Sequence, residues 1–289
     1  MLGSILLPTD FSAAAVHTAR CARSLAARFG ARLTLLHALP EVDRSLATLE
    51  GGGVLLDEVL DYQRMVARGR LEELAERELN GAGAGIVLVE KDPAEAIAEF
   101  ARSSPVDLVM MPTRGCGPFR RFILGSVTAK VLHDVACPVW TGTHVEEMPP
   151  EASSIRTVLC ALDLSGTSDL VLNWAARLAE RLGAALSVAH AIPSLDAHPE
   201  IHYMESDLRR FLVGRAREKI TGMLEAVGRP EAGIVVRGGT VSEVVRAAAQ
   251  EAGADVAVIG RADNDSLMGR LRTNSYAIIR DCPCPVVSV

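Results

Sequence analysis

Residues 5–40 read ILLPTDFSAAAVHTARCARSLAARFGARLTLLHALP, and residues 158–193 read VLCALDLSGTSDLVLNWAARLAERLGAALSVAHAIP. The two stretches align without a gap, 153 residues apart. Each contains an apolar strand, an Asp-x-Ser turn, an Ala-rich helix that ends at glycine, and a second strand that runs into His-Ala-x-Pro. A repeat of about 150 residues is a whole domain and not the unit of a solenoid, so the sequence predicts two similar domains in tandem.

Strands alternate with helices in both halves of the chain. Strands are predicted at 4–7, 32–38, 86–90, 106–111 and 138–141, and in the second half at 158–162, 186–190, 234–237, 256–259 and 286–289. Between them, helices are predicted from Ser12 to Gly30, and at 55–79, 93–103 and 126–135. Most of the strands are apolar on both faces, which is typical of a parallel sheet covered by helices on both sides. The predicted fold class is therefore α/β.

The segment between the two copies, GTHVEEMPPEASS at residues 142–154, has paired prolines and no hydrophobic periodicity. Such a composition is typical of a linker. We place domain 1 at residues 1–143, the linker at 144–154 and domain 2 at 155–289. A chain of 289 residues is long enough for each domain to bury its own core.

The composition excludes several classes of protein. Hydrophobic residues make up 49% of the chain and charged residues 23%, as in globular proteins. No apolar run reaches the ~20 residues that cross a bilayer, and residues 1–8 do not resemble a secretory signal, so we expect a soluble, cytoplasmic protein. A net charge of −6 and 4% aromatic residues argue against a nucleic-acid or membrane surface. The six cysteines lack zinc-site spacing, and we expect reduced, mostly structural thiols.

The residues that point to binding chemistry follow the first and fourth predicted strands. Open parallel sheets bind ligands beyond the carboxyl ends of their strands, where the strand order reverses. Pro8-Thr9-Asp10 ends the first strand, and a glycine-containing loop that leads to Gly125-Ser126 follows the fourth. Glycine at the start of a helix lets an anion approach the free N–H groups, and the Ser126 hydroxyl adds a donor. On spacing alone, ordinary capping and turn formation explain these residues as well as phosphate binding does.

Motifs in both halves make the chain similar to tandem universal stress proteins. The nucleotide loop of that family reads Gly-x2-Gly-x9-Gly-[Ser/Thr], and this chain has Pro112-x2-Gly115-x9-Gly125-Ser126. The runs Asp-Pro-Ala-Glu-Ala-Ile at 92–97 and Ala-Cys-Pro-Val at 136–139 are also typical of the family. Pro112 departs from the pattern, because it removes an N–H and adds a ring where the family has glycine.

The resemblance implies two Rossmann-like domains of the adenine nucleotide alpha hydrolase-like type, each with a five-stranded parallel sheet of order 3-2-1-4-5. It also implies that Asp10 and the Ala38 main chain face the adenosine of ATP, and that the loop and the helix start hold the phosphates. Mg²⁺ would arrive with the nucleotide. The nucleotide-binding residues expected from the resemblance are Pro8, Thr9, Asp10, Ala38, Met111, Pro112, Gly115, Gly125, Ser126 and Val127.

The second copy has lost most of the loop motif. It reads Gly260-x2-Asp263-x9-Thr273-Asn274, which keeps the first glycine alone. Asp263 and Asp265 place negative charge where phosphates would lie, and Thr273 adds a Cβ where close approach is needed. We therefore expect domain 1 to bind most of the nucleotide and domain 2 to be a structural or regulatory copy.

The leading hypothesis is a cytoplasmic, ATP-binding stress-response regulator that is not a dedicated enzyme and is at most a weak ATPase. The alternatives are a slow ATPase or nucleotidyl-transferring relative of the same fold, and a protein-interaction module that works without nucleotide. No catalytic or protein-held metal site is predicted, and His37 and His190 are expected to be hydrogen-bonded structural residues. We expect the closing strands of the two domains to pair within one chain. Dimerisation of whole chains and an unidentified protein partner stay open.

Overall fold

The computed structural model describes residues 2–41, 53–79, 83–113, 124–142, 151, 154–192, 205–261 and 270–289. Within these ranges, residues 53–55, 205–206 and 270–273 are described by their backbone alone. The chain divides into two compact units, one formed mainly by each half. The domain limits of 1–143 and 155–289 stay predictions, and each half is described below by itself.

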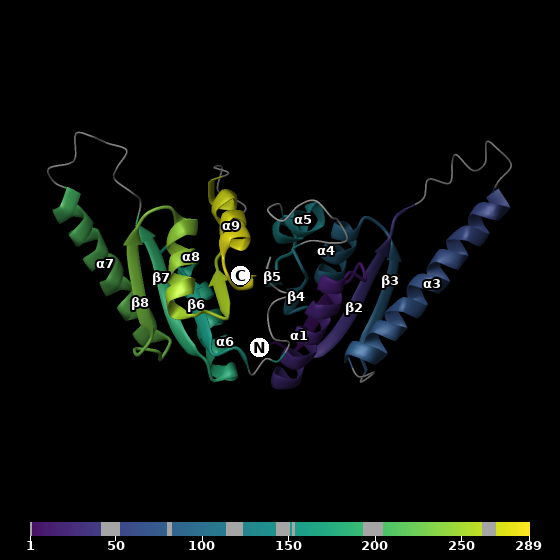
Figure 1. The fold of residues 1–289 in the computed structure, drawn as a ribbon, viewed down its shortest axis with the longest axis horizontal. Coiled ribbons are helices and arrows are strands. Elements are labelled where there is room, and N and C mark those ends of the chain that lie inside the picture. The colour runs from purple at the N-terminus through teal and green to yellow at the C-terminus, as the bar shows by residue number, and fades with distance from the viewer. Residues whose placement is uncertain are drawn as a thin grey trace. The chain divides into compact units, whose positions relative to one another are not determined.

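The first half contains an open sheet of five strands (Figure 1). Its elements are β1 (Ser4–Pro8), α1 (Ala13–Phe29), β2 (Arg32–Leu39), α3 (Gly53–Leu79), β3 (Gly85–Glu90), α4 (Pro93–Ser103), β4 (Leu108–Met110), α5 (Ser126–Asp134) and β5 (Val139–Thr141). The strands lie in the order β3-β2-β1-β4-β5, and β1 pairs in parallel with both β2 and β4. The predicted order 3-2-1-4-5 is therefore confirmed.

Helices cover both faces of this sheet. α1 packs against α3, and α4 packs against α5. Right-handed crossovers from β1 through β2 to β3 place α1 and α3 on one face. The chain then returns past β1 to β4 and β5, and this reversal places α4 and α5 on the other face.

The second half repeats the arrangement. Its elements are β6 (Thr157–Ala161), α6 (Ser168–Leu182), β7 (Ala185–Ile192), α7 (Glu205–Ala226), β8 (Gly233–Gly238), α8 (Val241–Ala252), β9 (Val256–Ile259), α9 (Arg270–Asp281) and β10 (Val286–Ser288). The strand order β8-β7-β6-β9-β10 is again 3-2-1-4-5, counted from the first strand of this half. The predicted α/β class and the tandem duplication are both confirmed.

Local sequence signals set the helix ends as predicted. The Ser12 hydroxyl accepts a hydrogen bond from Ala15 N at the start of α1, and Gly30 ends that helix with a left-handed φ of +68°. Asp92 caps α4 in the same way, with Pro93 at its first position. The fourth strand is shorter than the predicted 106–111: it covers Leu108–Met110, and the Asp107 carboxylate just before it accepts hydrogen bonds from the N–H groups of Gly3 and Ser4.

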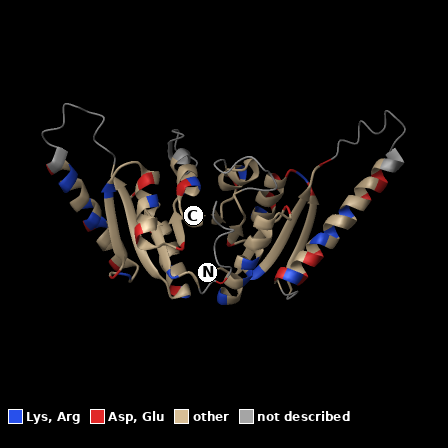
Figure 2. Ribbon diagram, viewed as in Figure 1, with Lys and Arg blue, Asp and Glu red and all other residues tan. Residues whose placement is uncertain are grey.

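The strands form the cores of the two halves. In the first half Ile5, Leu6, Leu35 and Leu108 are fully buried, and the second half buries its own set of aliphatic side chains. Figure 2 shows charges of both signs along α3 and α7, whereas the strands carry few. In the described part of the chain, every helix is too short or too polar to cross a membrane.

Candidate functional site

The carboxyl ends of β1 and β4 lie side by side in the first half. Ile5 pairs with Leu108 and Leu6 with Val109, so the residues after both strands meet at one edge of the sheet. The helix after β1 covers one face of the sheet and the helix after β4 covers the other. This edge is therefore the switch point at which open α/β sheets bind ligands.

The turn after β1 holds Asp10 in a defined position. Asp10 Oδ1 accepts a hydrogen bond from Ser12 N at 3.0 Å, and Thr9 Oγ1 accepts one from Phe11 N at 3.0 Å. Phe11 has a left-handed backbone with φ of +62°, which is uncommon for a residue other than glycine. The exposed Asp10 carboxylate is thus presented at the sheet edge by a tight turn, while Thr9 is buried.

His37 is part of the frame that supports this turn. Its Nδ1 lies 2.7 Å from the carbonyl oxygen of Thr9. A carbonyl oxygen accepts but does not donate, so Nδ1 carries the proton. His190 makes the equivalent bond to the Leu162 oxygen, at 2.8 Å. The interpretation of both histidines as hydrogen-bonded structural residues is confirmed.

The main chain of Ala38 faces the same edge. Thr9 N donates to the Leu36 oxygen at 2.9 Å, so the peptide groups of Leu36 point toward β1. In a parallel ladder, alternate residues point to the same neighbouring strand. The N–H and C=O of Ala38, two residues further on, therefore point toward the side on which β1 has already ended at Pro8.

Hydrogen bonds join the segment after β4 to the start of α5. Gly125 N donates to the Thr113 oxygen at 2.9 Å. The Thr128 hydroxyl lies 3.2 Å from the Pro112 oxygen and 3.4 Å from that of Thr113. Thr113 and Thr128 are not among the residues predicted from the sequence. Both are buried, and neither a threonine after a strand nor one in the first turn of a helix gives a signal of its own for such a contact.

The amino end of α5 carries N–H donors that the helix itself does not use. Gly125 is its capping residue and gives no side-chain cap, and the first intrahelical bond runs from Ala129 N to the Gly125 oxygen. The N–H groups of Ser126, Val127 and Thr128 therefore have no acceptor within the helix. Together with the positive end of the helix dipole, they can receive an anion.

The structure thus brings most of the predicted residues to one edge. Pro8, Thr9 and Asp10 end β1, Ala38 lies on β2, the buried Met111 and half-buried Pro112 follow β4, and Gly125, Ser126 and Val127 begin α5. Gly115 lies outside the described residues, as do the neighbouring Arg114, Arg120 and Arg121.

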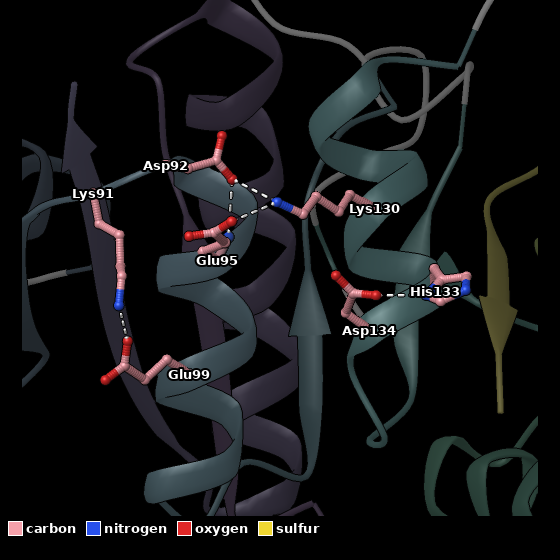
Figure 3. Close-up of polar contacts among 7 residues, drawn as sticks. All are labelled: Lys91, Asp92, Glu95, Glu99, Lys130, His133 and Asp134. Atoms are coloured by element: carbon pink, nitrogen blue, oxygen red, sulfur yellow. Dashed lines mark hydrogen bonds and ion pairs between the residues drawn. The ribbon is translucent and has the colours of Figure 1, made fainter. Parts of the chain in front are cut away.

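Lys130, one turn beyond Ser126 on α5, is held by carboxylates. Its Nζ lies 3.0 Å from Glu95 Oε1 and 3.2 Å from Asp92 Oδ1, so α5 is tied to the amino end of α4 (Figure 3). The N–H of Glu95 and the Lys130 ammonium together hold the pKa of the Asp92 carboxyl below its usual value. The two carboxylates in turn raise the pKa of Lys130. The Lys130 charge is therefore already compensated within the protein.

A cation from the long helix α3 covers the β1–α1 turn. The guanidinium carbon of Arg70 lies 4.1 Å from the centroid of the Phe11 ring, at cation–π distance. His37 is a further neighbour of that ring, with centroids 4.5 Å apart. Phe11 and Arg70 are not among the residues predicted from the sequence, because their contact joins residues that are far apart in the chain.

The second half builds the same frame with different contacts. Leu164 repeats the left-handed φ, at +61°, and the Lys219 ammonium of α7 donates to its carbonyl oxygen at 2.8 Å. Asp163 Oδ1 accepts hydrogen bonds from Ser165 N at 2.9 Å and from the Ser168 hydroxyl at 3.0 Å. Burial raises the pKa of the Asp163 carboxyl, but these hydrogen bonds outweigh it, so the pKa lies below its usual value.

Asp163 therefore serves to close its own turn. The loop side chains Asp263, Asp265 and Thr273 lie outside the part that the structure describes in full. In the described ranges, no group of three His, Cys, Asp or Glu side chains is placed to hold a metal ion.

Comparison with known proteins gives matches for both halves. The family model "Usp: Universal stress protein family" matches residues 1–141 and 154–289. The universal stress protein MJ0531 of Methanocaldococcus jannaschii is 30% identical over 135 residues, which are 47% of this chain and 78% of that protein. A universal stress protein of Thermus aquaticus is 34% identical over 140 residues, 48% of this chain and 97% of its own length.

Solved structures show the same fold across nearly the whole chain. A universal stress protein from Archaeoglobus fulgidus superimposes with a TM-score of 0.70 at 24% identity, covering 99% of this chain and 97% of its own. A putative universal stress protein from Pseudomonas aeruginosa gives a TM-score of 0.65 at 19% identity, covering 100% of this chain and 93% of its own. At these identities the likeness concerns the fold.

Proposed function

Because the chain belongs to the universal stress protein family, with a family domain in each half, we propose that it is a cytoplasmic stress-response regulator that binds ATP mainly through domain 1. The observation that carries the proposal is the amino end of α5. It lies at the switch point of the sheet, its cap is the glycine Gly125, and its first N–H groups have no partner within the helix.

The donors at this end suit a phosphate group. Gly125 has φ of −61° and ψ of 146°, a conformation that any residue adopts, so its backbone does not require glycine. The absence of a Cβ is better explained by the close approach of an anion to the Ser126 and Val127 N–H groups. The exposed Ser126 hydroxyl supplies a further donor. In this proposal Mg²⁺ is bound together with the phosphates.

The adenosine would lie across the ends of β1 and β2. The Ala38 N–H and C=O point to the space beyond the end of β1, where they can donate to and accept from the edge of an adenine ring. The Asp10 carboxylate, fixed by Ser12 N, is placed to accept from the ribose hydroxyls. The contact of Arg70 with the Phe11 ring supports the turn that carries Asp10.

Equilibrium binding of ATP to the full chain, by calorimetry with and without Mg²⁺, tests the proposal. We expect about one ATP per chain, and at least tenfold weaker binding, about 1.4 kcal/mol, in Gly125→Asn. Asparagine caps helices as well as or better than glycine, so this variant should keep its melting temperature while its side chain obstructs the anion site.

The matched control is Thr240→Asn. Thr240 caps α8 of domain 2 with a similar backbone, φ −69° and ψ 147°, and likewise gives no side-chain cap bond to that helix. ATP binding should be unchanged in this variant. Binding that is undetectable at millimolar ATP, or equal in the parent and Gly125→Asn, would contradict the proposal.

A further inference from the structure

Two cysteines of domain 2 lie in sulfur–sulfur contact. Cys282 directly follows α9, and Cys284 comes two residues later, just before Pro285 and β10. Their Sγ atoms are 3.6 Å apart. Both residues are buried, with 1% and 5% of their surface exposed. The chain bends at Pro283 and Cys284, and this bend turns the two side chains toward each other.

The pair is a feature of domain 2 alone. The segment Asp281-Cys282-Pro283-Cys284-Pro285 aligns with Asp-Val-Ala-Cys-Pro at residues 134–138, so Val135 occupies the place of Cys282 in domain 1. Cys137 there keeps the position of Cys284. The second thiol is therefore dispensable for the turn between the last helix and the last strand, and its presence in domain 2 calls for another explanation.

We propose that Cys282 and Cys284 form a reversible dithiol–disulfide site that is oxidised by hydroperoxides. The sulfurs are already in contact, and a disulfide bond requires them to approach to ~2.05 Å. A disulfide across two residues closes a very short loop and constrains the unfolded chain little, so it is a poor structural staple. Strain in such a small ring makes the bond easily reduced, which favours reversible chemistry.

The oxidation proceeds in two balanced steps. The Cys282 sulfur attacks one oxygen of the hydroperoxide: an S–O bond forms, the O–O bond breaks, and the leaving oxygen departs protonated as water or an alcohol. The Cys284 sulfur then attacks the Cys282 sulfur, so that the S–S bond forms, the S–O bond breaks and water leaves. The two thiols lose two electrons and two protons in total, and the peroxide is reduced.

The contact affects the two thiols in opposite directions. The neighbouring Cys284 thiol lowers the pKa of Cys282 below its usual value. The same contact, together with burial, raises the pKa of Cys284. Cys282 is therefore the nucleophile toward peroxide, and Cys284 is the resolving thiol. The disulfide would join the end of α9 to the start of β10.

Mass spectrometry of the full-length chain tests the site without any substitution. The reduced protein is exposed to excess hydrogen peroxide under native conditions, alkylated in denaturant and digested with trypsin. Cleavage after Arg280 gives a peptide that begins at Asp281 and carries both cysteines. We expect this peptide to lose two hydrogens and to escape alkylation, and dithiothreitol to reverse both changes. Cys160 on β6 is the internal control: it is as deeply buried as Cys282 but is not part of the sulfur–sulfur contact, and it should remain alkylated.

Cys282→Val is the matched variant, because it installs the residue that domain 1 carries at this position. It should fold with an unchanged far-ultraviolet spectrum and keep Cys284 available to alkylation after peroxide. Two free thiols at 282 and 284 in the treated parent would overturn the proposal. So would equal oxidation of Cys160, which would show general unfolding, or disulfides formed between chains.

Discussion

Phe11 in domain 1 and Leu164 in domain 2 occupy the same place in the repeat and share one left-handed backbone conformation, with φ of +62° and +61°. In both domains the carboxylate just before this residue accepts a hydrogen bond from the N–H two positions on. The long helix that follows the second strand of each half, α3 or α7, then contacts the left-handed residue through a cation, Arg70 on the ring of Phe11 or Lys219 on the carbonyl of Leu164. The strained turn is therefore a property of the fold and not of one domain.

This conformation predicts an unusual order of stability. A β-branched residue is disfavoured in the left-handed region, whereas glycine adopts it freely. In urea unfolding, Phe11→Val and Leu164→Val should each be less stable than the glycine variant at the same position, by about 1–2 kcal/mol. The control is Leu170, exposed on α6, where helix propensity makes valine the better residue. If the valine variant were more stable than the glycine variant at all three positions, this would argue against the left-handed turn.

The two turn carboxylates are predicted to differ in function. Asp10→Asn should weaken ATP binding about tenfold, or ~1.4 kcal/mol, because the amide loses the charge that attracts ribose hydroxyl donors. Asp163→Asn should leave ATP binding within about twofold, because that carboxylate is used by Ser165 and Ser168 and its domain lacks the glycine loop. Calorimetry on both full-length variants distinguishes the cases. Two ATP molecules per chain, or equal losses, would show that domain 2 also binds.

Asp163 should also give domain 2 a stability that depends on pH. Its pKa is lowered in the folded state, so its contribution is complete above the unfolded pKa of about 3.9 and is lost as the pH falls through the folded pKa. The parent should exceed Asp163→Asn in unfolding free energy at pH 7 by no more than about 1 kcal/mol, because the carboxylate is half exposed to screening water. Urea titrations should show the gap closing as the pH falls below about 4. If the difference in unfolding free energy between the parent and Asp163→Asn did not depend on pH, it would come from the amide group itself and not from the loss of the carboxylate charge.

An ion pair between α1 and α3 is predicted to stabilise domain 1. Glu78 is only 8% exposed and accepts two hydrogen bonds from Arg20, at 2.6 and 3.0 Å. Glu78→Gln leaves the guanidinium poorly compensated and should cost about 1–2 kcal/mol in urea unfolding at pH 7. Glu73→Gln is the control, because Glu73 pairs with Arg77 on the exposed surface of the same helix and should contribute much less. Equal losses would show that burial of Glu78 has no effect.

The pairing of the closing strands within one chain stays a prediction from the sequence. An apolar edge strand left open tends to pair with another strand. Removal of residues 286–289 should therefore lower the melting temperature of domain 1 as well as that of domain 2. Scanning calorimetry of the truncated chain measures this, and an unchanged transition of domain 1 would contradict the pairing.

The sequence predicts the fold well where the signal is local. Ser12, Gly30 and the Asp92-Pro93 pair mark helix ends by chemistry that acts within a few residues, and all three hold in the structure. The apolar strands and the duplication then leave little choice of topology. The strand before Met111 is shorter than predicted, and the bonds from the N–H groups of Gly3 and Ser4 to the Asp107 side chain give no local signal, because they join residues that are far apart in the sequence.

The candidate site is harder to predict, because its frame depends on contacts across the chain. The positions of Asp10, Gly125 and Ser126 follow from spacing and from resemblance. The contacts of Thr113, Thr128 and Arg70 do not, since each joins elements that only the folded sheet brings together. Ser165 also illustrates the limit: it repeats Ser12 in sequence, yet α6 begins only at Ser168, with Thr167 as its capping residue.

The hydrogen bond between Thr113 and Gly125 joins the two ends of the loop that connects β4 to α5. The two anchor points are fixed to each other and to Thr128 by groups outside the intervening residues, so the start of α5 keeps its place whatever lies between. The loop between Thr113 and Gly125 can therefore vary in sequence and length while its two ends stay fixed. Lineages could lengthen, shorten or replace the loop, and engineers could graft one from a relative, and so change ligand preference without redesigning the sheet.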